Sequence, residues 1–186
     1  MTFWGYKFET LSTLPRPWGQ TSRQHIESRP THPVTNAAQY CSVVRTGIGP
    51  TTLCLGGEVD CLWDGTKPPT PGAPIGWVEL KTSVDVRSDR DALNFERKLL
   101  KYWVQSFLLG VPRIVVGFRS KDGVLVRVEE METAGIPARV AGRRPRPLWD
   151  GDVCINFASA FLACECPPLR SLIVACGVLI LGDGQG

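Results

Sequence analysis

Residues 77–119 decide the fold, and they read WVELKTSVDVRSDRDALNFERKLLKYWVQSFLLGVPRIVVGFR. Segment 111–119 is a dense β-branched run, typical of a central strand, and segment 77–82 predicts a second strand. Segment 88–109 predicts the clearest helix of the chain, and Gly110 ends it. A helix between two strands is a crossover, so we expect it to cover one face of the sheet in a mixed α/β fold.

Two short acidic strings bear on function: GEVD, which contains Glu58 and Asp60, and VELK, which contains Glu79 and Lys81. Alternate residues of a strand face the same side, about 6.5–7 Å apart. We therefore expect Glu58 and Asp60 to share one face, and Glu79 and Lys81 to share another. If the two strands pair, the carboxylates and the ammonium group meet on one surface.

Crowded carboxylates repel one another, and a bound Mg²⁺ or Mn²⁺ removes that conflict because hard cations prefer oxygen ligands. Asp60, Glu79 and the backbone carbonyl of Leu80 are the first candidate ligands. A second ion about 3.5–4 Å away would need a further acid. Glu58 and Glu9 are the candidates for that role.

Lys81 and Gln105 are the candidates that would act on the substrate. Lys81 can orient an attacking water or neutralise charge on a phosphate. Gln105, with Lys101 and Lys98 on preceding turns, makes a polar stripe on an otherwise apolar helix, and that stripe could face a site. A plainer interpretation stays open, with Glu-x-Lys as a solvated strand face and Gln105 as a hydrogen bonder at the edge of the core.

Composition narrows the class of protein. The chain has 186 residues, a formal net charge of +3 and 43% hydrophobic residues, which suits one domain with a core. Seven cysteines, an odd number, favour a reduced intracellular protein, and two histidines weaken histidine-based zinc or Ser–His–Asp chemistry. The apolar run 172–181 is shorter than the roughly 20 residues of a membrane-spanning helix, so we expect no membrane association.

The remaining segments give weaker signals. We expect a short strand or helix end at 3–10, strands at 40–45 and 52–55 that pair before Glu58, a hairpin strand at 124–128, and a second helix at 153–164. Proline-containing stretches at 14–35, 66–76 and 135–149 predict loops. The arginines of the last loop favour a solvated surface over phosphate contact.

At this point the sequence resembles the decapping and exoribonuclease (DXO) family. The motifs that carry the resemblance are GYKFE at 5–9, GEVD at 57–60, VELKTS at 78–83, KLLKYWVQSFLLGVPRIVVGFR at 98–119 and DVCINFASAFLA at 152–163. The resemblance implies a fold related to the PD-(D/E)xK nucleases, with a central mixed sheet and flanking helices. In this chain we expect that fold to be incomplete, with a partial catalytic domain at 1–163 and a divergent apolar tail at 164–186.

The resemblance also implies an activity: metal-dependent hydrolysis at RNA 5′ ends that are incompletely capped, NAD-capped, triphosphorylated or monophosphorylated, followed by 5′→3′ degradation. It implies Mg²⁺ or Mn²⁺, with two ions, held by Glu9, Glu58, Asp60, Glu79 and the carbonyl of Leu80. Glu58, Lys81 and Gln105 would position the nucleophile or the scissile phosphate.

Partners and location follow from the same resemblance. The family's fungal member is the activating partner of a nuclear 5′→3′ exoribonuclease, which implies such a partner and a location in the nucleus, with the cytoplasm as a second location. The family's proteins carry a substantial portion before the GYKFE motif, which this sequence lacks. The alternative function is therefore an inactive form that acts only as a binding or regulatory protein.

Overall fold

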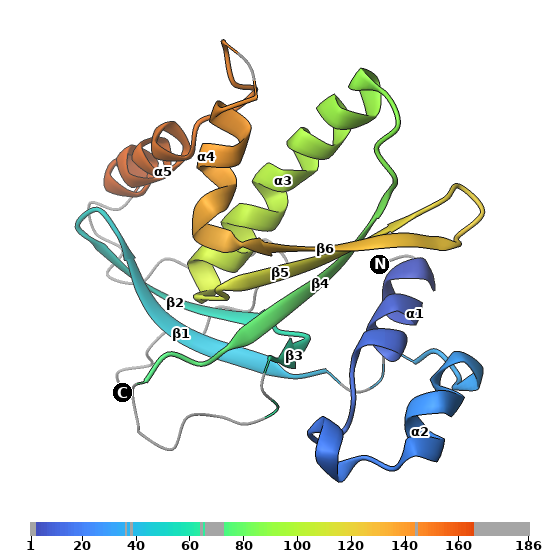
Figure 1. The fold of residues 1–186 in the computed structure, drawn as a ribbon. Coiled ribbons are helices and arrows are strands. Elements are labelled where there is room, and N and C mark those ends of the chain that lie inside the picture. Colours follow the sequence, from blue (N-terminus) through green and yellow to red (C-terminus); the bar gives the residue numbers. More distant parts are fainter. Residues whose placement is uncertain are drawn as a thin grey trace, which may run out of the picture.

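The computed structural model describes residues 3–165 except 36, 38, 64, 66–72 and 144. In this part of the chain, the strands form a four-stranded sheet of order β3-β4-β5-β6 and a separate hairpin of β1 and β2 (Figure 1). The strands are β1 (Cys41–Ile48), β2 (Thr51–Glu58), β3 (Cys61–Leu62), β4 (Trp77–Val84), β5 (Arg113–Arg119) and β6 (Leu125–Glu132).

The crossover predicted from residues 77–119 is confirmed. β4 and β5 pair in parallel, and α3 (Asp89–Leu109) connects them. Ser88 caps this helix by accepting a hydrogen bond from the Asp91 N–H, and Gly110 ends it with a left-handed backbone at φ 68°. β6 then returns antiparallel to β5, as the hairpin signal predicted.

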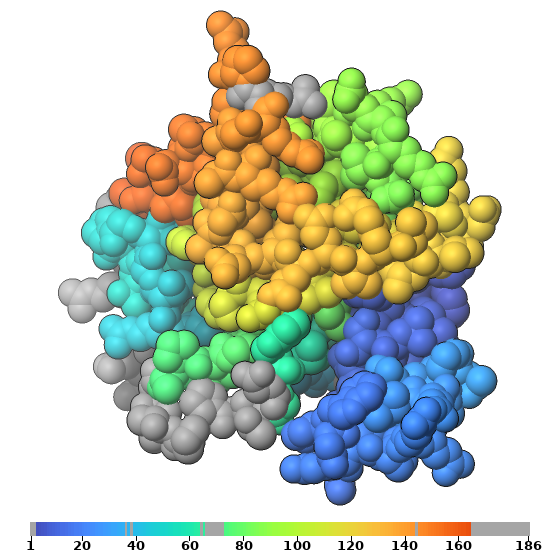
Figure 2. Space-filling view, viewed as in Figure 1, coloured from blue at the N-terminus to red at the C-terminus, as the bar shows by residue number. Residues whose placement is uncertain are grey.

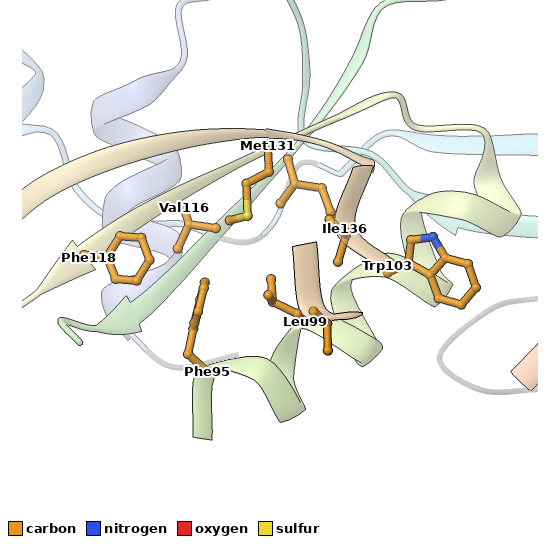
Figure 3. Packing of buried hydrophobic residues seen from close by; sticks show 9 residues of the cluster. Phe95, Leu99, Trp103, Val116, Phe118, Met131 and Ile136 are labelled. Atoms are coloured by element: carbon orange, nitrogen blue, oxygen red, sulfur yellow. The ribbon is translucent and has the colours of Figure 1, made fainter. Parts of the chain in front are cut away.

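The main core lies between α3 and one face of the sheet (Figure 3). Each large apolar side chain buried there contributes about 1.5–3 kcal/mol relative to an exposed one. Phe107 of α3, although apolar, lies outside this core and is 49% exposed. The buried cluster consists of Phe95, Leu99, Trp103, Ile114, Val116, Phe118, Met131, Ile136 and Val140.

The opposite face of the sheet is covered by α1 (Phe3–Ser12), which resolves the strand-or-helix ambiguity of residues 3–10 (Figure 1). Phe8 packs on Val78 and Leu80 of β4. A Cβ atom at Gly117 of β5 would lie 2.6 Å from the Phe8 ring, so only glycine permits this close approach. The sheet is therefore enclosed by α3 on one face and α1 on the other.

Two expected loops contain helices, so those predictions were wrong. Segment 14–35 contains α2 (Arg23–Ser28) with 3₁₀ turns at Trp18–Gln20 and Arg29–Thr31, and α1 and α2 lie together at one corner of the molecule (Figure 2). Segment 135–149 contains the 3₁₀ turn Thr133–Gly135 at its edge and α4 (Ile136–Ala141), whose Ile136 and Val140 are buried.

The expected C-terminal helix is present as α5 (Gly151–Glu165). Most of the expected loop at 66–76 and almost all of the expected tail at 164–186 lie outside the described residues. Among the helices that the structure describes, none is both long and apolar enough to cross a membrane.

The expected pairing of the two acidic strings was also wrong in detail. β2, which ends at Glu58, pairs with β1, and its register aligns Glu58 with Cys41. The short strand β3 makes the link instead, because Cys61 pairs antiparallel with Val78 of β4. The hairpin of β1 and β2 is fixed on the end of α3, where a Cβ atom at Gly57 would lie 2.4 Å from Leu109.

The close approach of Phe8 and Gly117 gives a stability prediction. Gly117→Ala should lower the free energy of unfolding by about 1–3 kcal/mol, because the new methyl group overpacks the α1 contact. For a chain of this size, thermal unfolding should shift down by about 2–4 °C per kcal/mol. Gly19→Ala is the control, since nothing lies within 4 Å of that Cβ position. Equal melting temperatures for the two variants would contradict the packing argument.

Candidate active site

Glu79 and Lys81 lie on the β4 face that α3 covers, as their alternation predicted. Glu79 is 3% exposed. Its Oε1 accepts hydrogen bonds from Lys81 Nζ and, at 3.1 Å, from Gln105 Nε2 of α3. The interpretation of Glu-x-Lys as a solvated strand face is therefore wrong, and Gln105 of the expected polar stripe reaches the candidate site.

Asp60 lies in the two-residue connection between β2 and β3, and not on a strand face with Glu58 as expected. Its Oδ2 accepts a 2.6 Å hydrogen bond from the backbone N–H of Leu80. The N–H and C=O of one strand residue point to the same edge of the strand. The Leu80 carbonyl therefore faces the β4 edge where Asp60 lies, while the Leu80 side chain is buried against Phe8.

Glu9 reaches this neighbourhood from α1. Its Oε1 is buried and has no hydrogen-bond partner among the described residues. Burial, followed by the charges of Asp60 and Glu58, raises the pKa of Glu9 to about 7. Glu58, half-buried at the end of β2, is therefore part of the same electrostatic neighbourhood.

The site holds more negative charge than its own cations balance. Burial raises the pKa of Glu79 to about 7, although the Lys81 ammonium acts in the opposite direction. Burial also raises the pKa of Asp60, against the hydrogen bond from the Leu80 N–H. These shifts mean that the ionised carboxylates lack compensation, which is the condition that a bound cation relieves.

Unpaired oxygens indicate where a metal would bind. Glu9 Oε1 and Glu79 Oε2 are both buried without a hydrogen-bond partner among the described residues, and carboxylate oxygens suit a hard divalent cation. In the same part of the chain, however, three or more acidic, His or Cys side chains do not already converge on a metal position. Lys81 and Gln105 engage Glu79 Oε1, and the Leu80 N–H engages Asp60 Oδ2, so the oxygens left for a cation are the unpaired ones.

Comparison with known proteins identifies the family. A family model described as a RAI1-like PD-(D/E)XK nuclease matches residues 1–166. The chain belongs to this family. The decapping nuclease RAI1 of Neurospora crassa is 65% identical over 162 residues, which is 87% of this chain and 39% of that protein. The decapping nuclease din1 of Schizosaccharomyces pombe is 41% identical and is matched over 44% of its length.

Solved structures agree with the fold of this RAI1-like chain. Candida albicans Rai1 in complex with pU5 and Mn²⁺ superimposes with a TM-score of 0.80 at 39% identity, over 86% of this chain and 42% of that one. Scheffersomyces stipitis Rai1 with (3′-NADP)⁺ and a calcium ion gives a TM-score of 0.79 at 38% identity, over 88% and 42% of the two chains. The chain spans less than half the length of the curated relatives it matches.

Two residues beside the site were not singled out from the sequence. Tyr102 takes the place expected for Lys101 in the polar stripe, because its hydroxyl donates to the Thr82 carbonyl at 3.4 Å. Lys101 is exposed. Cys61, which follows Asp60, has its pKa raised to about 12 by burial and by the neighbouring carboxylates, so its thiol stays protonated. The position of Cys61 directly after the acidic string GEVD was the one sequence signal that could have placed it beside the site.

The raised carboxylate pKa values give a pH prediction. Glu9 and Glu79 have folded-state pKa values near 7 against ordinary values of 4.5, so folding favours their protonated forms. Their stabilising effect is complete below pH 4.5 and is lost as the pH rises through about 7. In EDTA, the melting temperature should therefore fall between about pH 5 and pH 8.

Glu9→Gln is the variant that tests the cause. Glutamine cannot ionise, so the variant should lose less stability over this pH range than the unmodified chain. The pKa values of Asp85, Asp91 and Glu129 are lowered, so these groups titrate below their ordinary pKa values. They therefore do not contribute to a stability change between about pH 5 and pH 8. A fall of the same size in both proteins would show that Glu9 does not contribute.

Proposed function

We propose that this chain carries the catalytic site of a divalent-metal-dependent hydrolase that acts on RNA 5′ ends. The observation that carries the proposal is that Glu9, Asp60 and Glu79, brought from α1, the β2–β3 connection and β4, lie within electrostatic reach of one another beside Lys81 and Gln105. Their charges act on one another, and two of their oxygens are buried without a donor among the described residues. A structural ion pair does not need this surplus of buried carboxylates.

The acidic residues would hold the ions. Mg²⁺ or Mn²⁺, in one or two sites, would supply Lewis acidity and an activated water when bound. Glu9, Glu58, Asp60, Glu79 and the Leu80 carbonyl would be the ligands, directly or through water. The family's solved structures with Mn²⁺ and with calcium support divalent-metal use by the proteins in those complexes.

Lys81 and Gln105 would act on the phosphate and on Glu79. The Lys81 side chain is 17% exposed, so its ammonium group is partly shielded from water. This shielding strengthens its attraction for a phosphate. Gln105 donates to the same Glu79 oxygen and keeps that carboxylate oriented. Lys81 would bind a phosphate oxygen while Glu79 holds the ion, and Gln105 would position Glu79 and the phosphate, which are the roles we assign to them.

The substrate class is proposed from the relatives. Candida albicans Rai1 binds pU5, Scheffersomyces stipitis Rai1 binds (3′-NADP)⁺, and Schizosaccharomyces pombe Rai1 binds 3′-FADP in their solved complexes. We propose that this chain acts on 5′-phosphorylated, incompletely capped and NAD-capped RNA, with 5′→3′ degradation afterwards. A nuclear location and pairing with a 5′→3′ exoribonuclease belong to the same proposal and rest on the family resemblance.

The alternative of an inactive binding protein is not favoured. All the residues expected to act on metal or phosphate are present among the described residues, and those of β4 and α3 are in direct contact with one another. A site kept only as a binding surface would not require a carboxylate that is 3% exposed.

The proposal predicts metal-dependent cleavage of RNA. With Mn²⁺, the chain should release nucleotides from a 5′-monophosphorylated RNA, and Asp60→Asn or Glu79→Gln should lower the rate by at least about a hundredfold. Glu132→Gln on β6 is the matched control, since Glu132 is an exposed strand carboxylate away from the site. Removal of Mn²⁺ with EDTA should abolish the activity. Full activity in either site variant would refute the assignment.

A second assay addresses the cap. NAD-capped RNA incubated with the chain and Mn²⁺ should release NAD as a unit, which chromatography distinguishes from nicotinamide mononucleotide. Gln105→Ala should slow this release by about 10–100-fold, because Glu79 would lose one of its two orienting donors. Cleavage within the NAD pyrophosphate would contradict the proposed reaction at the phosphate that joins NAD to the RNA.

A further inference from the structure

The side chains that connect α3 to β4 form an ordered polar seam, defined here as Lys98, Tyr102 and Gln105. Lys98 Nζ donates to Ser83 Oγ at 3.1 Å, Tyr102 donates to the Thr82 carbonyl, and Gln105 donates to Glu79. The helix thus runs along β4 in the opposite chain direction (Figure 1), and the contacts follow in that order. The seam begins at the candidate metal ligands and extends away from them along the strand.

Among the described residues, no strand pairs with the second half of the β4 edge beside this seam. β3 pairs only with Trp77 and Val78, and the described residues provide no further strand on that side. Side chains occupy the edge instead, because Asp60 accepts from the Leu80 N–H and Tyr102 donates to the Thr82 carbonyl. Backbone groups that are already paired do not recruit another strand, so this edge suits a polar ligand better than β-strand addition.

Charge changes sign along the seam. Glu9, Asp60 and Glu79 make the site end acidic, while Lys81 and then Lys98 follow along β4. Ser83 lies two residues beyond Lys81 on the same face, so Lys98 is anchored about 6.5–7 Å further along the strand. One end of the seam would bind cations, and ammonium groups follow it along the strand. This order of charges suits a polyanion such as RNA, with its reacting phosphate at the metals and its later phosphates beside the ammonium groups.

The charge of Lys98 is not neutralised by the residues described. Its hydrogen-bond partner is a neutral hydroxyl, from a serine that is 3% exposed. None of the ion pairs between described residues includes Lys98, whereas Lys81 is paired with Glu79. Lys98 is an exposed residue whose ammonium group donates one hydrogen bond to Ser83, and an ammonium group has three donors, so it retains donors for an anion.

We propose that Lys98 is a phosphate-binding residue for the body of a single-stranded RNA, which runs from the metal site along the open edge of β4. This inference rests on the proposed function, since it assumes that the reacting phosphate lies beside Glu79 and Lys81. It adds a contact to a phosphate downstream of the reacting one. Tyr102 is a positioning residue, because its hydroxyl fixes α3 on β4 between Lys98 and Gln105.

Length dependence separates this role from catalysis. The experiment measures binding of 5′-monophosphorylated RNA by the full chain in Ca²⁺, using a mononucleotide and a pentanucleotide. Lys98→Gln should weaken pentanucleotide binding roughly fivefold and leave mononucleotide binding unchanged. It should also reduce the slope of log affinity against log salt by about 0.7, the value for one phosphate contact on a single strand.

Two further variants make the result specific. Lys101→Gln removes an exposed lysine from the same helix outside the seam and should bind both ligands as the unmodified chain does. Lys98→Arg keeps the charge and should restore most of the pentanucleotide affinity. Melting temperatures of all variants should agree within about 2 °C, because surface substitutions usually change stability by less than 0.5 kcal/mol.

The outcomes distinguish this inference from the proposed function. If the unmodified chain cleaves RNA with Mn²⁺ but Lys98→Gln binds the pentanucleotide normally, the seam proposal is wrong and the proposed function stands. Equal weakening for the mononucleotide and the pentanucleotide also overturns it, because Lys98 would then act at the reacting phosphate or through the fold. If the unmodified chain neither binds nor cleaves RNA, both proposals fall.

Discussion

The burial of Glu79 between β4 and α3 is the constraint on which the rest of the site depends. A carboxylate that is 3% exposed has little access to water, so donors or cations must balance its charge. Lys81 and Gln105 both donate to one of its oxygens, and the other has no donor among the described residues. The fold therefore leaves negative charge at Glu79 that is not fully balanced, and each neighbouring carboxylate increases this imbalance.

Two glycines let the other acidic residues approach that point. Gly57 allows β2 to lie against Leu109 of α3, which places the following Glu58 and Asp60 beside β4. Gly117 allows the Phe8 ring to lie on β5, which places the next residue of α1, Glu9, at the same edge. At both positions a methyl group would occupy the space of a buried side chain. Elements distant in the sequence thus meet at the site through close backbone contacts.

Local sequence signals predicted the crossover and the alternation of Glu79 and Lys81, because each depends on local patterns in its own helix or strands. They left open whether Gln105 faces the site, because that contact depends on how α3 packs on β4. They also indicated the pairing of β1 with β2 before Glu58. They did not predict β3, the strand that links GEVD to β4, because it is two residues long and carries no periodic pattern. Tyr102 replaced Lys101 in the seam because sequence spacing fixes helix neighbours and not the rotation of the helix on its sheet. The helix in segment 14–35 was missed among its prolines.

One helix serves the core and the site, and this explains how the polar seam is kept in place. Phe95, Leu99 and Trp103 pack on β5, and the seam residues occupy the neighbouring stripe of the same helix. Protein interiors are close-packed, so the apolar stripe resists displacements of a few tenths of an ångström. Catalytic groups must be held within about 0.5 Å of their working geometry. The apolar contacts of α3 therefore determine how accurately Gln105 and Lys98 meet β4, although they touch neither metal ligand nor substrate.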